Sequence, residues 1–190
     1  LWFHAASVGE FEQARPIIER LQRELPFRKL LLTFFSPSGY ELRKDYPLVD
    51  KVTYLPFATK RNAKKLLEIL PIDIAVMVKY EFWPAYLKAL KAKGVTTYLI
   101  SAIFRPKQLF FMPWGKGYLK LLHTFKRIFV QDQASAELLQ KHGIAHVEVA
   151  GDTRFDRVLD ICAAAKQLPL VQKFKGDALT FVAGSSWGPD

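Results

Sequence analysis

Cysteine is nearly absent from this 190-residue sequence, which contains only Cys162. A single thiol excludes an intramolecular disulfide, and such sparse cysteine is typical of proteins from a reducing compartment. Long hydrophobic runs are also missing, because the longest, such as residues 72–78, are too short to cross a bilayer as a helix. Half of the residues are nevertheless hydrophobic, which excludes a disordered chain and predicts a folded core.

Several well-known sequence motifs are missing too. The chain has no G-x-G-x-x-G, no Gly-Lys-Ser/Thr after a glycine-rich loop and no G-x-S-x-G. Nothing therefore supports a dinucleotide fingerprint, a P-loop or the nucleophile elbow of a hydrolase. The four histidines show no zinc-ligand spacing with cysteine. We expect neither a metal ion nor a cofactor.

Acidic residues are absent from residues 82–131, although nine Lys or Arg lie there and the net charge of the chain is +10. The same stretch is rich in aromatic residues. A basic and aromatic region favours an anionic partner with an apolar part, such as an anionic membrane surface. A solvated helix face beside ordinary core aromatics would give the same composition. Nucleic acid is not expected as a partner, because the basic residues do not form dense clusters.

Apolar runs alternate with amphipathic stretches along the chain, which predicts an α/β fold. Strands are expected at residues 1–5, 29–35, 51–55, 72–78, 95–101, 127–131 and 147–150. Helices are expected at residues 10–24, 38–45, 59–70, 83–93, 117–125, 134–142 and 151–165. The strands read as almost continuous apolar runs, as in parallel strands that are covered on both faces. We therefore predict a Rossmann-like parallel sheet with helices on both faces, whose ligands bind at the carboxyl ends of the strands.

Residues 1–165 form the predicted Rossmann-like domain. Residues 166–190 are interpreted as a polar linker followed by the first strand of a second, truncated domain, with the strand at residues 179–183. The sequence begins inside a strand-like run, so we also expect chain upstream of Leu1. Residues 104–117 interrupt the alternation with a long loop containing prolines, glycines and aromatics, which indicates either a functional contact or a loop folded onto its own core.

Three strand-to-helix turns carry candidate chemistry. Ser7 and Glu10 have the spacing of a helix capping box, yet the turn also opens at the expected ligand edge, where Glu10 could take a proton from a hydroxyl group. Glu81 follows the strand at residues 72–78 and is either a first-turn carboxylate favoured by the helix dipole or a second acidic group of the site. Ser38 and Gly39 begin a third helix whose backbone amides could bind a phosphate or a sugar.

Four stretches together resemble one family. They are WFHAASVGE (2–10), TFFSPSG (33–39), EFWP (81–84) and GDTRFD (151–156), in this order along nearly the whole chain. They are similar to the signature stretches of the transferases of 3-deoxy-D-manno-octulosonic acid (Kdo). The resemblance implies the N-terminal, acceptor-binding half of a GT-B glycosyltransferase. It implies inverting, metal-independent transfer from CMP-Kdo to lipid A precursor in lipopolysaccharide biosynthesis, at the cytoplasmic face of the bacterial inner membrane.

The resemblance also assigns expected roles to individual residues. Glu10 is the expected general base, and Glu81 the second acidic group. The acceptor site is expected to contain Ser7, Gly9, Ser38, Gly39, Arg105 and Lys107. Contact with the membrane is expected from Phe110, Phe111, Trp114 and Lys116. The expected partners are lipid A precursor, an anionic membrane and the missing C-terminal domain, which binds the donor sugar in this family.

Some positions differ from the family pattern. Lys79 stands where a further Glu is frequent, and residues 103–108 replace a run of Arg and Ser. These differences leave the acceptor contacts open. The alternatives are a GT-B glycosyltransferase with another acceptor and a basic domain that binds membranes or nucleic acid without catalysis. A fragment without the donor half is expected to be inactive.

Overall fold

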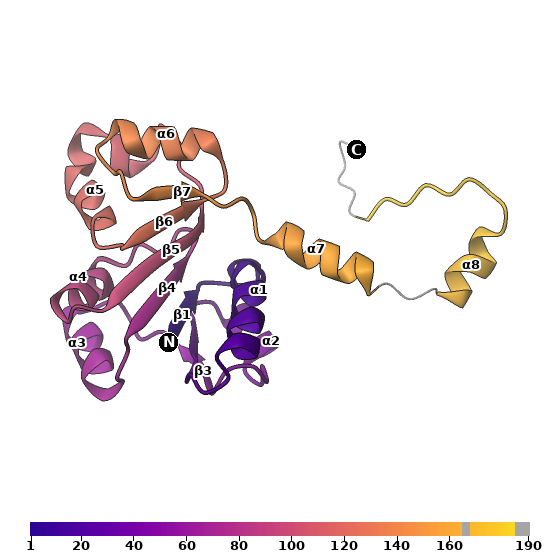
Figure 1. Ribbon diagram of the computed structural model, residues 1–190, viewed down its shortest axis with the longest axis horizontal. Helices are drawn as coiled ribbons and strands as arrows, with labels where there is room; N and C mark the ends of the chain where they lie inside the picture. The colour runs from indigo at the N-terminus through magenta and orange to yellow at the C-terminus, as the bar shows by residue number, and fades with distance from the viewer. Residues whose placement is uncertain (165–167, 185–190) are drawn as a thin grey trace. The chain divides into compact units, whose positions relative to one another are not determined.

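The computed structural model describes residues 1–164 and 168–184, and its centre is a parallel sheet (Figure 1). Within these residues seven strands follow the order β3-β2-β1-β4-β5-β6-β7, and every neighbouring pair is parallel. The strands are β1 (Trp2–Ala5), β2 (Leu31–Phe34), β3 (Lys51–Tyr54), β4 (Ile74–Val78), β5 (Thr96–Ala102), β6 (Arg127–Val130) and β7 (Val147–Val149). The predicted Rossmann-like fold is therefore confirmed.

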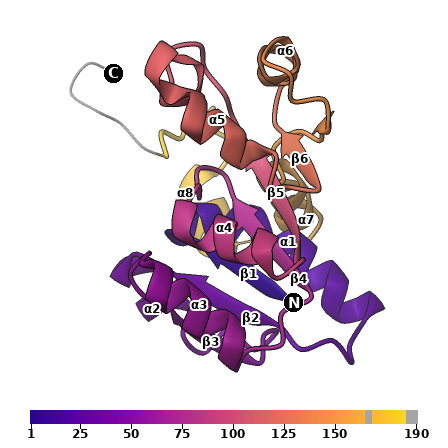
Figure 2. The same cartoon turned by 90° about the vertical axis from the view of Figure 1, so that its left-hand side faces the viewer.

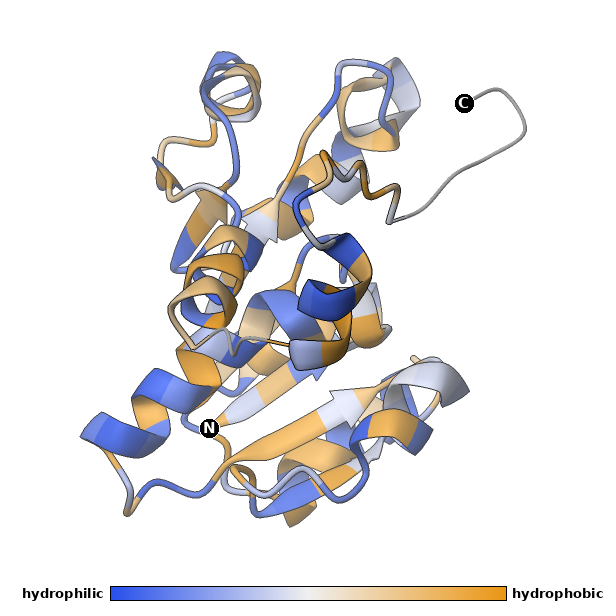
Figure 3. Ribbon diagram, turned by 90° about the vertical axis from the view of Figure 1, so that its right-hand side faces the viewer, coloured by the Kyte–Doolittle hydropathy of each residue, from blue (hydrophilic) through white to orange (hydrophobic). Residues whose placement is uncertain are grey.

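Helices cover both faces of the sheet (Figures 1 and 2). One face carries α3 (Lys60–Ile69), α4 (Pro84–Ala92), α5 (Lys116–Leu122) and α6 (Gln133–Lys141), and the other carries α1 (Val8–Glu24) and α2 (Pro37–Arg43). Each face has its own core. Trp2 points into the first core and Phe3 into the second, because successive side chains of a strand point to opposite faces. Several strands are coloured as hydrophobic in Figure 3, as expected for strands covered on both faces.

The strand order reverses between β1 and β4, which are neighbours in the sheet although β2 and β3 lie between them in the sequence. In an open α/β sheet, ligands bind outside the carboxyl ends of the strands at such a switch point. The backbone is unusual at this edge. Lys79, directly after β4, has a φ of 63°, and Ser101, near the end of β5, has a φ of 54°. Positive φ is uncommon for residues other than glycine and often marks functional sites.

The segment at residues 104–115 folds onto the core instead of forming an open loop. It contains two 3-10 turns, η1 (Leu109–Phe111) and η2 (Pro113–Gly115). Phe110 is buried and its ring packs 4.7 Å from the ring of Phe82. Gly115 is required here, because a Cβ atom would lie 1.6 Å from the Leu109 carbonyl oxygen. The structure shows this segment folded onto its own core, and a functional contact through its exposed side chains stays a prediction.

The chain divides into two compact units, residues 1–157 and a second unit that begins at Val158, of which the structure describes residues 158–164 and 168–184. Helix α7 (Arg154–Ala163) begins in the first unit, and α8 (Pro169–Lys175) lies within the predicted linker. Residues 179–183, predicted as a strand, form none, because no strand lies beside them in the described part of the chain and a lone strand has no hydrogen-bonding partner. The assignment of residues 166–190 to another domain stays a prediction.

Candidate functional site

Glu10 lies in the first turn of α1, directly after β1, at the switch point of the sheet. The predicted capping box with Ser7 is present. The Ser7 amide donates to Glu10 Oε2 over 3.0 Å, and the Ser7 hydroxyl donates to the same oxygen. No described residue donates to Oε1 of this half-buried side chain. Gly9 beside it is exposed, and an added Cβ would have no neighbour closer than 3.8 Å, so a ligand can approach the backbone there.

Glu81 lies in the turn between β4 and α4, next to the β1 turn along the sheet edge. Unlike Glu10, it is buried, with only 7% of its surface exposed. Its Oε2 atom lies 3.0 Å from His4 Nε2 and also accepts a hydrogen bond from Trp83 Nε1. No residue of the described ranges donates to its Oε1. Both carboxylates are therefore held through one oxygen, and their other oxygen accepts no hydrogen bond from the residues that the structure describes.

His4 is a site residue that the sequence did not indicate. It is fully buried in β1, and its Nδ1 atom lies 2.9 Å from Thr33 Oγ1 on β2. Thr33 Oγ1 in turn accepts the indole N–H of Trp2 at 2.8 Å. A continuous polar chain thus runs from Trp2 through Thr33 and His4 to Glu81. His4 and Thr33 lie within the stretches WFHAASVGE and TFFSPSG that resemble the family, but neither residue was predicted to belong to the site.

The turn after β2 lies on the other side of β1. Ser38 is exposed and its hydroxyl lies 2.8 Å from the hydroxyl of Ser36, whereas Gly39 is buried. A Cβ atom at Gly39 would lie 2.4 Å from the Phe34 ring, so packing alone accounts for this glycine. The rings of Phe35 and Trp83 are tilted toward each other with centroids 5.0 Å apart, which places an aromatic pair beside Glu81. The predicted roles of Ser38 and Gly39 in acceptor binding stay predictions.

The segment after β7 forms hydrogen bonds to α1, the helix that carries Glu10. Thr153 donates its hydroxyl to the Gln13 carbonyl oxygen of α1 over 2.7 Å, and its Oγ1 lies 3.2 Å from Ser101 Oγ. Asp152 pairs with Arg154, whose hydrogen bonds hold the pKa of the Asp152 carboxyl below its ordinary value although partial burial raises it. The GDTRFD stretch therefore contacts α1, the helix that carries Glu10.

The remaining predicted residues lie on the segment between β5 and α5. Arg105, Lys107, Trp114 and Lys116 are exposed, and Trp114 exposes 75% of its surface. Phe110 is different, because burial in the aromatic cluster keeps it from any surface contact. Phe111 is half-buried and its ring packs 4.6 Å from His142. The prediction that Phe110 contacts the membrane is therefore wrong, whereas Trp114 and Lys116 are exposed and their membrane contact stays a prediction.

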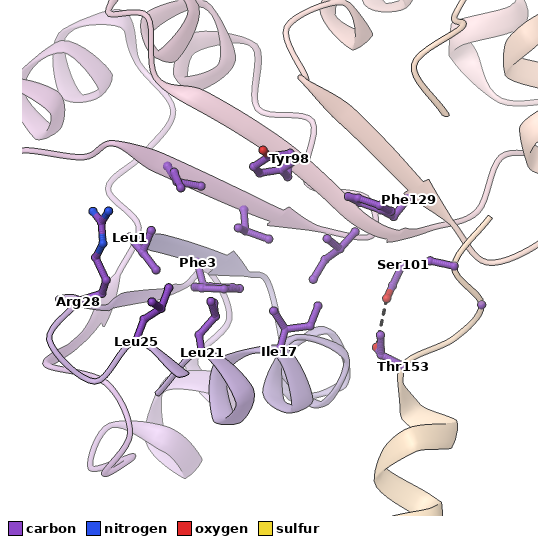
Figure 4. A pocket seen from close by; sticks show the side chains of 15 residues that line it. Leu1, Phe3, Ile17, Leu21, Leu25, Arg28, Tyr98, Ser101, Phe129 and Thr153 are labelled. Carbon is purple, nitrogen blue, oxygen red and sulfur yellow. Dashed lines mark hydrogen bonds between the residues drawn. The ribbon is translucent and has the colours of Figure 1, made fainter. Parts of the chain in front are cut away.

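An apolar cavity of about 490 Å³ lies on the α1 face of the sheet (Figure 4). Figure 4 shows Phe3, Ile17 and Leu21 on one side of it, and Tyr98 and Phe129 on the other. No acidic side chain lines this cavity, so it offers no general base. Residues 1–164 and 168–184 also contain no group of three or more His, Cys, Asp or Glu placed to hold a metal ion. Among the described residues, Glu10 and Glu81 are the carboxylates in the two turns that flank the switch point of the sheet.

Solved structures identify the class of fold. UDP-GlcNAc 2-epimerase from Neisseria meningitidis, solved with UDP-GlcNAc, matches 93% of this chain and 53% of its own at a TM-score of 0.66 and 15% identity. The 2-epimerase from Methanocaldococcus jannaschii matches 95% of this chain and 53% of its own at a TM-score of 0.62 and 16% identity. At these identities the likeness shows the fold alone. The chain has the fold of the N-terminal half of a GT-B protein.

Sequence comparison identifies the family within this class. The model of the 3-deoxy-D-manno-octulosonic-acid transferase family matches residues 1–157. A 3-deoxy-D-manno-octulosonic acid transferase from Aquifex aeolicus is 31% identical over 189 residues, which cover 97% of this chain and 46% of the relative. The transferase from Bordetella pertussis is 29% identical over 168 residues, covering 84% of this chain and 38% of the relative. This chain belongs to the Kdo transferase family and spans less than half the length of these relatives.

Proposed function

We propose that the chain forms the acceptor-binding half of a glycosyltransferase that moves Kdo from CMP-Kdo to lipid A precursor in lipopolysaccharide biosynthesis. Membership of the family supports the activity. The observation that carries the site is the position of Glu10, which follows β1 at the switch point and keeps Oε1 free of donors from the described chain. The donor CMP-Kdo would be bound mainly by the C-terminal domain of the complete protein.

Glu10 is the general base of this proposal. Its Oε1 atom accepts the proton of the acceptor hydroxyl, the hydroxyl oxygen attacks the anomeric carbon of Kdo, and CMP leaves with the electrons of the broken bond. Attack opposite to the leaving group inverts the anomeric centre, and the step needs neither metal nor cofactor. The helix N-terminus stabilises the Glu10 carboxylate and so weakens it as a base. Displacement of water by the bound acceptor opposes this effect, because desolvation disfavours the charged form.

The acceptor has phosphates and acyl chains, and the basic aromatic region of the chain suits both. Leu109, Trp114 and Tyr118 are exposed apolar side chains near Lys107 and Lys116 in the sequence. Exposed aromatics beside cations favour an anionic membrane surface. We propose that the protein acts at the cytoplasmic face of the bacterial inner membrane, which family membership and this anionic-membrane preference support. None of the described helices combines the length and hydrophobicity that crossing a bilayer requires.

A groove between α3 and α4 extends the basic surface. Its volume is about 670 Å³, its floor includes Ala85 and Ala89, and Lys60, Lys64, Lys88 and Lys93 line it. The two helices lie side by side in Figure 2. An apolar floor between lysines suits an anionic lipid.

The proposed membrane contact of Trp114 and Lys116 can be tested with vesicles that contain anionic lipid. Binding of the chain to these vesicles should weaken in a Trp114→Ser/Lys116→Ser variant and persist in a Lys141→Ser control, whose lysine lies on α6.

The experiment that tests the proposed function is a transfer assay with the complete protein, CMP-Kdo and lipid A precursor, with the product identified by mass spectrometry. We expect a product heavier by one or more Kdo units, with and without a chelator. Glu10→Gln should abolish most transfer, whereas Glu24→Gln at the far end of α1 should not. Transfer to another acceptor instead of lipid A precursor would show a glycosyltransferase with a different acceptor. Binding to vesicles or nucleic acid without any transfer would show a basic binding domain without catalysis.

A further inference from the structure

We propose that His4 positions the Glu81 carboxylate, as the central member of a one-way chain of hydrogen bonds that starts at Trp2. His4 is fully buried and takes no part in the proton transfer assigned to Glu10. The effect of His4 on Kdo transfer rests on the proposed function. The hydrogen-bond chain and the tautomer that it requires do not, so they can be tested separately.

The direction of the chain is set at its Trp2 end. An indole N–H can only donate, so the bond from Trp2 Nε1 occupies a lone pair of Thr33 Oγ1 and leaves the hydroxyl proton for another acceptor. Two acceptors lie near that hydroxyl group, His4 Nδ1 at 2.9 Å and the Phe3 carbonyl oxygen at 3.4 Å. His4 Nδ1 itself also lies 3.1 Å from the Thr33 carbonyl oxygen, which would accept a proton carried on Nδ1. The contact between the hydroxyl group and Nδ1 is the shortest of the three, so the proposed chain assigns the hydroxyl proton to it. Nδ1 is then the unprotonated nitrogen of a neutral ring.

The other end of the chain agrees with this direction. A carboxylate only accepts hydrogen bonds, so His4 Nε2 must carry the proton that it shares with Glu81 Oε2 over 3.0 Å. Trp83 donates its indole N–H to the same oxygen. A neutral His4 protonated on Nε2 pairs the side chains of Trp2, Thr33, His4 and Glu81 in turn, and the 3.1 Å contact of Nδ1 with the Thr33 carbonyl oxygen is then not a hydrogen bond. The hydrogen bond that Nδ1 accepts thus determines that the ring proton is on Nε2, because the bond made by one ring nitrogen of a histidine sets the protonation of the other.

The fold makes this arrangement rigid. His4 is in register with Thr33 on β2 and with Met77 on β4. The series of hydrogen bonds therefore crosses neighbouring strands of the sheet at the switch point. Glu81 itself follows the positive-φ residue Lys79. Two N–H donors from outside its own backbone hold Oε2, and the side chain is about nine-tenths buried. Oε1 is thereby presented in one orientation for the acceptor sugar, without a proton step at His4.

The tautomer is testable by nitrogen NMR of the chain labelled at histidine, with the His4 signal assigned by its loss in His4→Gln. We expect a pyridine-type shift for His4 Nδ1 and a pyrrole-type shift for Nε2. His142 is an internal control of opposite type, because its Nδ1 lies 2.8 Å from the Leu138 carbonyl oxygen and must donate to it. A pyrrole-type shift at His4 Nδ1, whether in a neutral or a doubly protonated ring, would overturn the one-way chain.

The positioning role is testable by transfer kinetics of the complete protein. The amide of His4→Gln can replace the Nε2–H donor, whereas that of His4→Asn is too short to reach Glu81. We expect His4→Asn to lower kcat/KM for the acceptor about tenfold or more, with KM for CMP-Kdo unchanged. His4→Gln should transfer several-fold faster than His4→Asn at equal melting temperature. Equal rates of the two folded variants, or losses that follow their melting temperatures, would overturn the role.

These outcomes separate the inference from the proposed function. A wild-type protein that transfers no Kdo contradicts the proposed function, and the nitrogen shifts still decide the arrangement around His4. A wild-type protein that transfers Kdo equally well with Gln or Asn at position 4 keeps the proposed function and removes the positioning role. If neither variant folds, the His4 signal is assigned by elimination, from the signals lost in His123→Gln, His142→Gln and His146→Gln, and the shifts of the unmutated protein still decide the arrangement.

Discussion

The turns after β1 and β4 lie next to each other at one edge of the sheet, and each presents a carboxylate in a different way. Glu10 is half-buried and is held by the amide and hydroxyl of Ser7, three residues earlier in the chain. Glu81 is buried and is held by His4, which is 77 residues away in sequence. A locally held carboxylate keeps access to solvent and ligand, which suits a base. A carboxylate held by distant strands is fixed in place, which suits orientation of a substrate.

The difference also has an energetic side. A capping box can form whenever the helix forms, so Glu10 adds to helix stability without depending on the rest of the sheet. The Glu81 arrangement exists only when β1, β2 and β4 are assembled. Loss of the Glu81 carboxylate leaves a buried donor unpaired, and such a loss costs more than the hydrogen bond itself contributes.

The largest expected effect separates the two carboxylates by rate. In the complete protein, Glu10→Gln should lower kcat/KM by about 10²- to 10⁴-fold, because it removes a general base. Glu81→Gln should lower it by only about tenfold, because the amide oxygen can still accept from His4 and Trp83. Steady-state transfer assays with lipid A precursor measure both. Equal losses would erase the proposed division of roles.

The next effect concerns the free energy of unfolding, for which a change at Glu81 is expected to cost more than a change at Glu10. Glu81→Leu should lower the free energy of unfolding of the chain by about 1–3 kcal/mol, because it leaves the buried Nε2–H of His4 without an acceptor. Glu10→Leu should cost about 1 kcal/mol, as expected for loss of a helix cap. Urea unfolding followed by circular dichroism gives both values. A larger loss for Glu10→Leu would argue against the buried network.

Removal of the Ser7 hydroxyl tests the local support of Glu10 alone. Ser7→Ala should cost about 1 kcal/mol of unfolding free energy, because a helix cap is lost. Thr59→Ala is a matched control at α3, where the Thr59 hydroxyl accepts the Asn62 amide over 3.1 Å. Both variants should lose similar stability in urea, and only Ser7→Ala should change the transfer rate. A change of rate in Thr59→Ala would show that cap loss acts through general stability.

The smallest expected effect is on the pH dependence of stability, through the Asp152–Arg154 pair in the segment that contacts α1. Arg154 holds the pKa of Asp152 below its ordinary value, so this pair stabilises the fold above the unfolded pKa and loses its contribution as the pH falls through the lowered, folded pKa. Arg154→Ala should therefore make stability less dependent on pH between about pH 5 and pH 2. The difference should stay below about 0.5 kcal/mol because Arg154 is half exposed. Urea midpoints across this range measure it, and identical pH profiles would contradict the pairing.

The sheet could be predicted from the sequence because parallel strands covered on both faces read as apolar runs. Seven of the eight predicted strands are present in the described residues, with ends shifted by at most two residues, and the eighth, predicted at residues 179–183, is not formed. The unexpected features depend on packing. Phe110 looked like an exposed loop aromatic, but Gly115 lets the 3-10 turns close tightly and bury it. Helix α8 was hidden in a Lys-rich stretch that has no buried face.

The site was predictable only where it is local in sequence. Ser7 and Glu10 are three residues apart, so their contact follows from helix geometry. His4, Thr33 and Glu81 come from three separate segments, and no spacing rule brings them together. Strand order decides their contact, since β1 lies between β2 and β4. The roles of Glu10 and Glu81 in catalysis stay predictions.

The most direct test of the account is the pH dependence of kcat/KM for Kdo transfer by the complete protein, measured for wild type and Glu10→Gln. The account predicts that the wild-type rate falls at acidic pH as the base becomes protonated, and that the residual rate of Glu10→Gln lacks this acidic limb. An acidic limb that persists in Glu10→Gln but disappears in Glu81→Gln would contradict the account and make Glu81 the base.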